Sequence, residues 1–305
     1  HTRPRRLVSK VFTRRIVEEY EQQIRDLAID VVDRAIANDE FDIVIDVAKQ
    51  LPMRMLGALM GTPDSDGDHL VELGDALLGN TDPEFTAHVV DQVDTDEFRM
   101  MPFRSPAGFE LFEYARQQAE LRRTEPRDDV IAKLLAPTTD GEPLTELEFM
   151  NFFTVMVAAG NDTTRYTMAG TMKTMIEHPA LFEQLRGLPD DHAAWRTATD
   201  ELLRWTTVTT HFRRTATCDV ELRGKKIREG DKVVIWFVSG NFDDEQFTDP
   251  YTLDLTRSPN DHVTFGPGGP HFCLGALLAR LEAPVLFEEL LPRIASIELV
   301  GPTER

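Results

Sequence analysis

The longest helical pattern in the chain runs from Thr145 to His178, in the stretch TELEFMNFFTVMVAAGNDTTRYTMAGTMKTMIEH. Thr145 and Glu148 have the capping-box spacing that starts a helix. Pro179 ends the pattern, because a proline disfavours helical backbone at the residue before it. At about 1.5 Å per residue the helix measures on the order of 50 Å, enough to cross a whole domain.

Other helical patterns lie on both sides of this run. One apolar stripe at helical spacing consists of Ile24, Leu27, Ala28, Val31 and Ala35. A buried helix is predicted in LPMRMLGALMGTP, where Gly61 and Pro63 stop it, and further helices in 105–123 and 274–291. Strand-like alternation appears only in 219–239, around turns at Gly224 and at Gly230 and Asp231. The sequence therefore predicts one mainly α-helical domain over residues 1–305, with a small β-region.

The segment 80–104 is acidic and has weak periodicity, with an apolar end at Met100, Met101 and Phe103. Irregular segments of this length are usually lids, binding loops or disordered. A lid over an apolar site and a disordered segment are both open interpretations.

Composition excludes several classes of protein. Two cysteines in 305 residues are too few for a disulfide framework, and nothing resembles a secretory signal. No apolar run approaches the roughly 20 residues that a membrane span needs. The net charge of −20 argues against general nucleic-acid binding. We expect a soluble protein of the reducing cytoplasm.

The start of the chain is basic, although the chain as a whole is acidic. It holds several cations before the first acid at Glu18: Arg3, Arg5, Arg6, Lys10, Arg14 and Arg15. A solvated helix face and a docking site for an anion or an acidic partner both fit this pattern. The chain begins without Met, inside a helical pattern, and ends abruptly at ELVGPTER. We expect it to be a fragment of a longer protein.

The first chemical motif is AAGNDTT, in the middle of the long helix. Gly160 removes a side chain where a bulky ligand could approach. Asp162 and Thr163 follow, and threonine hydroxyls can bond back to the carbonyl four residues earlier. An acid and an alcohol in a buried notch suit proton delivery, while a helix face that meets solvent explains the same residues.

The second motif is DELLRW, in which Glu201 and Arg204 are neighbours on one helix face. By itself the pair indicates an ordinary surface ion pair.

The third motif is FGPGGPHFCLGALLAR, at 265–280, with Cys273 just before a predicted helix. No second cysteine or histidine stands at zinc-ligand spacing, and the loop lacks cysteine-protease and dinucleotide-binding signatures. One soft ligand to a haem iron is the remaining good fit. Cys218, near a predicted strand, is most simply a small core residue.

In this order the three motifs resemble those of a bacterial cytochrome P-450, a haem-thiolate monooxygenase, along essentially the whole chain. The resemblance implies haem b between the long helix and the cysteine loop, with Cys273 as the proximal thiolate ligand of the iron. Asp162 and Thr163 match the acid–alcohol pair that guides protons to bound dioxygen. Glu201 and Arg204 match a buried pair that braces the cysteine loop. The other residues expected to contact the cofactor are His1, Arg5, Ala159, Gly160, Arg214, Phe265, Gly266, His271 and Gly275.

The resemblance also implies an activity. The protein would activate O2 and hydroxylate C–H bonds of an apolar small molecule, with contacts expected from Met156, Ala159, Val208 and Thr210. Electrons would come one at a time from NAD(P)H through a ferredoxin reductase and a ferredoxin, which would dock on the basic start. We expect a cytoplasmic monomer. A peroxide-driven peroxygenase and a non-catalytic haem sensor or ligand carrier are the alternatives, and the acid–alcohol pair argues against both.

One departure from the family points to a subgroup. The family usually has Phe seven residues before the cysteine, where this chain has Gly266, and Phe265 is one position further out. This arrangement, with AAGNDTTR and GNFDDEQF, is similar to members that hydroxylate sterol side chains and branched lipids. The family also has segments before and after this stretch, so we expect an N-terminal segment and a C-terminal tail to be missing here.

Overall fold

The computed structural model describes residues 2–138, 141–189 and 191–301. The chain forms two compact units: unit 1 consists of residues 1–186 and 274–305, and unit 2 of residues 187–273. Each unit has its own elements and its own buried side chains. The expected single domain over residues 1–305 stays a prediction.

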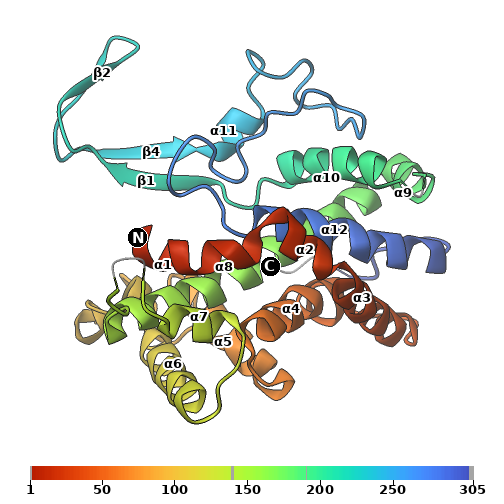
Figure 1. The fold of residues 1–305 in the computed structure, drawn as a ribbon. Helices are drawn as coiled ribbons and strands as arrows, with labels where there is room; N and C mark the ends of the chain where they lie inside the picture. Colours follow the sequence, from red (N-terminus) through yellow and green to blue (C-terminus); the bar gives the residue numbers. More distant parts are fainter. Residues whose placement is uncertain (1, 139–140, 190, 302–305) are drawn as a thin grey trace. The chain divides into compact units, whose positions relative to one another are not determined.

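Unit 1 is built from helices, labelled in Figure 1. The α-helices are α1 (Thr2–Val8), α2 (Arg14–Glu19), α3 (Glu21–Ile36), α4 (Gln50–Met60), α5 (Gly67–Leu78), α6 (Ala107–Thr124), α7 (Val130–Leu135), α8 (Glu146–Glu177), α9 (Pro179–Arg186) and α12 (Ala276–Leu290). Short 3-10 or π turns join them: η1 (Ser9–Phe12), η2 (Ile43–Ala48), η3 (Asp64–Asp66), η4 (Asp96–Phe98), η5 (Pro102–Arg104) and η6 (Leu291–Arg293).

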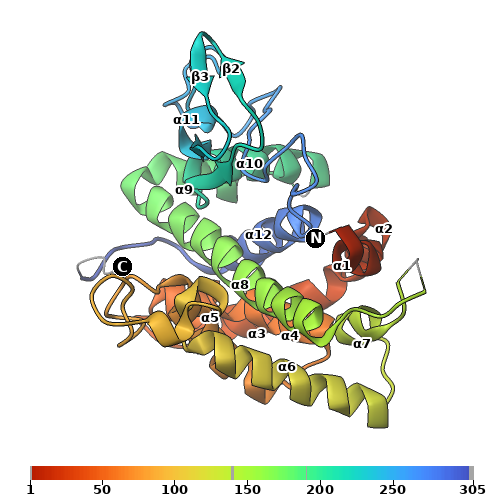
Figure 2. The same cartoon turned by 90° about the vertical axis from the view of Figure 1, so that its left-hand side faces the viewer.

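Helix α8 is the long helix that the sequence predicts. The Glu148 N–H donates to the Thr145 hydroxyl, and the Thr145 N–H donates to the Glu148 carboxylate at 2.9 Å, which completes the capping box. Within unit 1, α8 packs against α4, α5 and α6, which Figure 2 shows grouped along one side of it. The helix is therefore buried on one side, with Phe153 and Val157 fully enclosed.

The end of α4 shows how a buried arginine completes this packing. Gly61 ends the helix in the left-handed region, at φ 69°, as the sequence predicts. Arg122 on α6 donates to the carbonyls of Met60 at 3.0 Å and Gly61 at 2.7 Å. Its Nε donates to Asp129 at 3.0 Å. Arg122 thus satisfies carbonyls that a helix end leaves without intrahelical partners.

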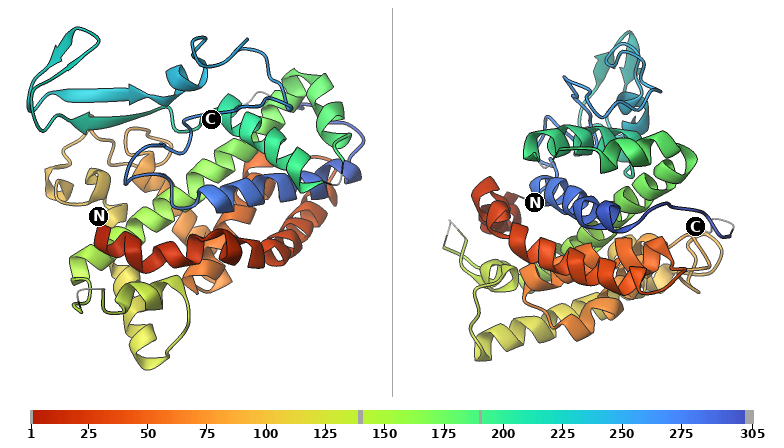
Figure 3. Two further views of the ribbon diagram at one scale, coloured as in Figure 1. Left: turned by 45° about the horizontal axis from the view of Figure 1, so that its top comes forward. Right: turned by 90° about the vertical axis from the view of Figure 1, so that its right-hand side faces the viewer.

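Two helices from opposite ends of the sequence pack together. The predicted stripe of α3 is buried at Ile24, Ala28, Val31 and Ala35, whereas Leu27 is half-buried. Helix α12 lies along α3, and the views of Figure 3 agree on this. Arg25 donates to Glu288 at 2.6 Å and to Glu289 at 2.9 Å, so ion pairs join the same two helices.

Unit 2 holds the small β-region. Its elements are α10 (His192–Thr206), β1 (His211–Thr215), β2 (Val220–Leu222), β3 (Lys225–Ile227), β4 (Lys232–Trp236) and α11 (Phe237–Asn241). β2 and β3 pair as the predicted hairpin, with positive φ at Arg223 and Gly224. β4 pairs antiparallel with β1, which the sequence did not predict. HFRRT lacks strand-like alternation because every residue of β1 is exposed.

Two further segments can be compared with the sequence. Cys218 was expected in the core, and this prediction is wrong: the residue is exposed in a bend between β1 and β2. Segment 80–104 is irregular, as predicted, with Asn80 Nδ2 donating to the Phe103 carbonyl at 2.6 Å and Met100 85% exposed. Within the described residues, no helix is both long enough and apolar enough to cross a membrane.

Glu282 on α12 gives the fold a testable pH dependence. The side chain is buried, and burial raises its pKa to about 8. At pH values between the ordinary carboxyl pKa and about 8, the folded chain therefore holds a proton that the unfolded chain has lost. The free energy of unfolding falls as the pH rises through this window. The quantity to compare is the free energy of unfolding of Glu282→Gln minus that of wild type. We expect this difference to be about 2–4 kcal/mol more favourable to the variant at about pH 8 than at about pH 5. Urea unfolding at both pH values measures this, with the exposed Glu72→Gln as control, and a pH-independent difference would contradict it.

Candidate functional site

The cysteine loop is held by its own backbone. The Cys273 N–H donates to the Phe265 carbonyl at 2.9 Å, and the Gly266 N–H donates to the Val263 carbonyl at 2.9 Å. Gly266 and Gly268 have φ of 64° and 86°, in the left-handed region that favours glycine. The loop therefore closes on itself, and Cys273 is exposed and not in a disulfide.

Aromatic side chains support the loop within unit 2. The Phe265 ring lies 5.7 Å from the ring of buried His262 and 6.5 Å from the ring of Phe272. His262 Nε2 lies 3.2 Å from a carboxylate oxygen of Asp200 on α10. Phe265 is therefore fixed between a histidine anchored to a helix and a second ring of the loop.

Glu201 and Arg204 on α10 form a fully buried ion pair. Arg204 Nε and Nη2 donate to the two carboxylate oxygens of Glu201, each at 2.8 Å. Both side chains have 0% exposure. The pair is therefore not the surface ion pair that DELLRW indicates by itself, and burial makes each partner depend on the other.

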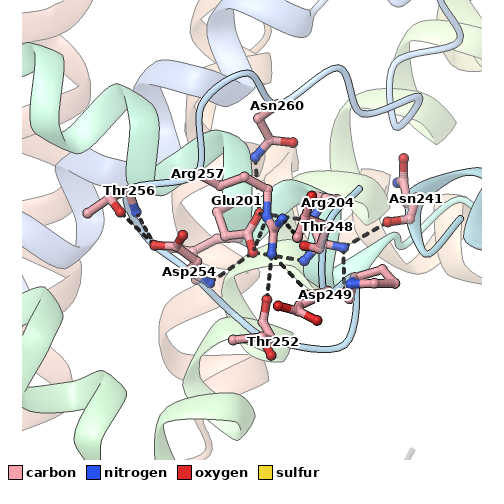
Figure 4. A network of polar contacts seen from close by, with 12 residues as sticks. Glu201, Arg204, Asn241, Thr248, Asp249, Thr252, Asp254, Thr256, Arg257 and Asn260 are labelled. Carbon is pink, nitrogen blue, oxygen red and sulfur yellow. Dashed lines mark hydrogen bonds and ion pairs between the residues drawn. The ribbon is translucent and has the colours of Figure 1, made fainter. Parts of the chain in front are cut away.

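Sequence reasoning missed a third and a fourth member of this network, shown in Figure 4. Arg257 Nε donates to Glu201 at 3.1 Å, and Asn260 Nδ2 donates to it at 3.1 Å. The remaining Arg257 donors bind the carbonyls of Thr248 and Thr252, each at 2.8 Å. The segment carries no periodic signal, so only the folded chain brings Arg257 to Glu201.

Asn241 connects the ion pair to the cysteine loop. Arg204 Nη1 donates to the Asn241 carbonyl at 2.7 Å. The Asn241 side chain accepts from the Val263 N–H at 2.7 Å and donates to Thr264 Oγ1 at 3.0 Å. Val263 and Thr264 directly precede Phe265, so the polar contacts run from α10 to the start of the loop.

The other predicted residues of unit 2 lie around its surface. Arg214 on β1 is exposed, with its guanidinium 5.5 Å from the Phe212 ring centre. His271 is exposed in the cysteine loop. Thr210 is exposed, and Val208 is half-buried. Arg214 and His271 are therefore two basic side chains that solvent or an anionic group can reach.

Asp162 on α8, in unit 1, shares an arginine with a second acid. Arg165 donates to Asp162, one turn earlier on the same helix, and to both oxygens of Asp75 on α5, at 2.7 and 3.2 Å. Burial raises the pKa of Asp162 to about 6. Arg165 lowers this pKa, and the like charge of Asp75 raises it again. Asp162 can therefore gain and lose a proton near neutral pH.

Thr163 lies on a different side of α8 from Asp162. Its hydroxyl donates to the Ala159 carbonyl at 2.9 Å, the back-bond that the sequence suggests. Ala159 and Thr163 are exposed within unit 1, whereas Asp162 is half-buried. The helix continues through this region to Glu177. Within the described residues no hydrogen bond joins Asp162 to Thr163, so a proton would need another carrier between them.

Gly160 and Met156, also on α8, have other surroundings than the sequence suggests. A Cβ at Gly160 would lie 3.2 Å from the methyl groups of Leu56 on α4. Close helix packing therefore explains this glycine without a ligand. Met156 is buried in unit 1.

The remaining predicted cofactor contacts are in unit 1. Arg5 on α1 is half-buried, and Gly275 precedes α12 with open space where a Cβ would lie. His1 lies outside the described residues.

The donor set fits a haem. Within residues 2–138, 141–189 and 191–301, no three His, Cys, Asp or Glu side chains gather into a metal cluster. An exposed cysteine without further ligands suits an iron that a macrocycle already holds. Added Cβ atoms at Gly268 and Gly269 would meet nothing within 4 Å, so this part of the cysteine loop is open.

Comparison with known proteins agrees with this chemistry. A profile of the cytochrome P-450 family matches residues 196–294. The methyl-branched lipid omega-hydroxylase of Mycobacterium tuberculosis (strain ATCC 25618 / H37Rv) is 38% identical, over 95% of this chain and 65% of that protein. The steroid C26-monooxygenase of Mycolicibacterium smegmatis is 36% identical, over 100% of this chain and 67% of that protein.

Solved structures agree as well. CYP268A2 of Mycobacterium marinum, in complex with pseudoionone, superimposes with a TM-score of 0.86 at 38% identity. The match covers 96% of this chain and 69% of that one. The chain belongs to the cytochrome P-450 family, and the predicted mainly α-helical fold is confirmed. It spans about two thirds of the length of these relatives.

The buried network makes a prediction about stability. Glu201→Gln would leave Arg204 and Arg257 without their shared carboxylate, and breaking a buried pair costs about 3–5 kcal/mol. We expect a loss of that size in the free energy of unfolding, and less haem retained by the purified chain. Urea unfolding and the haem-to-protein ratio measure both, with Glu221→Gln on exposed β2 as control. A variant as stable as this control would show that the network does not brace unit 2.

Proposed function

We propose that this chain is the haem-binding part of a monooxygenase that hydroxylates C–H bonds of an apolar small molecule, in which the Cys273 thiolate would hold the haem iron. The exposed Cys273 in its closed glycine-rich loop carries the proposal. Haem b, when bound through a thiolate, supplies the activation of O2. Both units would contribute residues, so we also propose that residues 1–305 act as one domain.

Basic residues would hold the carboxylates of the cofactor. Arg214 and His271 in unit 2 and Arg5 in unit 1 are the candidates, with His1 as a further one from the sequence. Phe265, Gly266 and Gly275 would lie against the macrocycle, with Ala159 from α8. Gly160 remains in this proposal only as part of α8, because the side on which it lacks a side chain packs against Leu56.

Asp162 and Thr163 would deliver protons. The Asp162 carboxyl titrates near neutral pH, which suits a group that gives up a proton and regains one in each cycle. The Thr163 hydroxyl donates its hydrogen bond to the Ala159 carbonyl. The hydroxyl oxygen can therefore still accept a hydrogen bond from a water or from a bound group.

The relatives suggest the substrate class. Their names refer to methyl-branched lipids and to steroids, and Gly266 in place of Phe agrees with that subgroup. We propose a sterol side chain or a branched lipid, contacted by Ala159, Val208 and Thr210. Met156 is a weaker choice because its side chain is buried.

Substrate binding tests the class. Titration of the ferric holoprotein with a sterol, a methyl-branched fatty acid and a straight-chain fatty acid should give a spin-state change with the first two. With ferredoxin, reductase and NAD(P)H, the same compounds should be hydroxylated. Spectral changes and hydroxylation confined to the straight-chain acid would contradict the proposed class.

The proton-delivery role makes its own prediction. Thr163→Ala removes the acceptor, so we expect the product formed per electron to fall about tenfold, with the missing electrons found in hydrogen peroxide. Thr197→Ala on α10 is the matched control, since its hydroxyl makes the same back-bond to Ala193. An unchanged product yield per electron would contradict the role.

The redox partner we propose is an acidic ferredoxin, docked on the basic start of the chain. Arg6 and Lys10 are exposed there. Charge reversal at these two residues should slow electron transfer at low salt, and the difference should shrink as salt screens it. Arg196→Glu on α10 is the control, and equal rates for all variants would contradict this docking site. We also propose that the protein is a monomer and that it lies in the cytoplasm.

A further inference from the structure

Two carboxylates in unit 1 share one guanidinium. Arg165 Nη1 and Nη2 donate to Asp75 at 3.2 and 2.7 Å, and Nη2 also donates to Asp162. The Arg165 side chain is 5% exposed, and the side chains of both acids are 17% exposed. One arginine therefore faces two acids where water has little access.

Charge then favours a proton on the pair. With both acids ionised, the cluster holds one negative charge more than Arg165 can neutralise, and burial makes that surplus costly. One proton bound by Asp162 makes the cluster neutral.

Two charged groups act on Asp162 in the part of the chain that the structure describes. Within the described residues, Arg165 and Asp75 are the groups whose charge or hydrogen bonds act on Asp162, although α8 also packs against α4, α6 and α12. The Tyr166 hydroxyl lies 3.4 Å from Arg165 Nη2, and burial raises its pKa above the ordinary value. Tyr166 thus stays protonated near neutral pH.

Unpaired polar atoms lie on the face of α8 that meets α5. Asn161 has 0% exposure, and its Oδ1 and Nδ2 have no hydrogen-bond partner. Arg165 Nε, one turn further along the helix, is buried and unpaired as well. A Cβ at Gly74 on α5 would lie 3.5 Å from Asn161 Nδ2, so Asn161 faces α5 beside Asp75. A buried water would satisfy such atoms.

We propose that Asp75 is a positioning residue for Asp162: it shares Arg165 with that acid and keeps on the Asp162 carboxyl a proton that Asp162 passes on. This inference rests on the proposed proton delivery by Asp162. A proton leaves the Asp162 carboxyl towards the site, the cluster becomes negative by one charge, and a proton from solvent restores neutrality. Asp75 stays bound to Arg165 throughout.

Asp75 affects how readily Asp162 gives up its proton. Burial raises the pKa of Asp162, but the ion pair with Arg165 lowers it and favours the ionised carboxylate, which is a poor proton donor. The like charge of Asp75 offsets that effect and brings the carboxyl closer to the working pH, where general acids are most effective.

An infrared titration of the ferric holoprotein tests the pair directly. The carboxyl C=O band that Asp162→Asn removes should titrate near neutral pH in wild type. In Asp75→Asn, whose amide oxygen can still accept from Arg165, the midpoint should fall by about 1 pH unit or more. Asp75→Glu should restore it, and Glu72→Gln on the same helix should leave it unchanged. If Asp75→Asn fails to fold, Asp75→Ser replaces it. A wild-type midpoint retained without Asp75 would overturn the inference.

The product formed per electron supplies a second readout, which a loss of structure would not imitate. In Asp75→Asn the product per electron should fall several-fold at neutral pH and recover at lower pH, with the affinity for substrate unchanged. A pH-independent loss, or equal loss of affinity, would contradict the positioning role. If wild type forms no product with any partner, the proposed function fails, whereas the infrared midpoint still decides whether Asp75 sets the titration of Asp162.

Discussion

Unit 2 depends on the guanidinium of Arg204. With 0% exposure, it donates to both oxygens of Glu201 and to the carbonyls of Asn241 and Pro250. The rings of Phe242 and Phe247 lie 5.2 Å from its centre and close it off from water. A buried charge tolerates few arrangements, because each lost partner leaves an unpaired group. The network therefore fixes where Asn241 lies, and Asn241 fixes the start of the cysteine loop.

The cysteine loop, held at its start by this network, presents an accessible thiol. Backbone bonds from Gly266 to Val263 and from Cys273 to Phe265 hold its shape, and glycines with positive φ make the turns. Cys273 itself makes no disulfide and is exposed. Unit 1 makes a different contribution through α8, where burial and shared charge set the pKa of Asp162 near neutral. Unit 2 thus presents an exposed thiol, the proposed haem ligand, and unit 1 a carboxyl with a raised pKa, the proposed proton donor.

Local patterns predicted what local physics determines. The capping box at Thr145 and the hairpin turn at Gly224 depend on a few neighbouring residues, and both are present. Partners far apart in sequence could not be predicted in this way. Arg257 meets Glu201 across 56 positions, and Asp75 meets Arg165 across 90. Gly160 was expected to make room for a ligand, but α4 packs against it. Cys218 was placed in a core because the exposure of the β-region has no sequence signal.

The central claim is thiolate ligation by Cys273, and the ferrous–carbonyl spectrum of the haem-loaded chain tests it most directly. Wild type should show the red-shifted Soret band of thiolate-ligated haem. Cys273→His, which offers imidazole nitrogen in place of sulfur, should move the band to the position of histidine-ligated haem. A wild-type Soret band already at the histidine position, or a thiolate band retained in Cys273→His, would contradict the account.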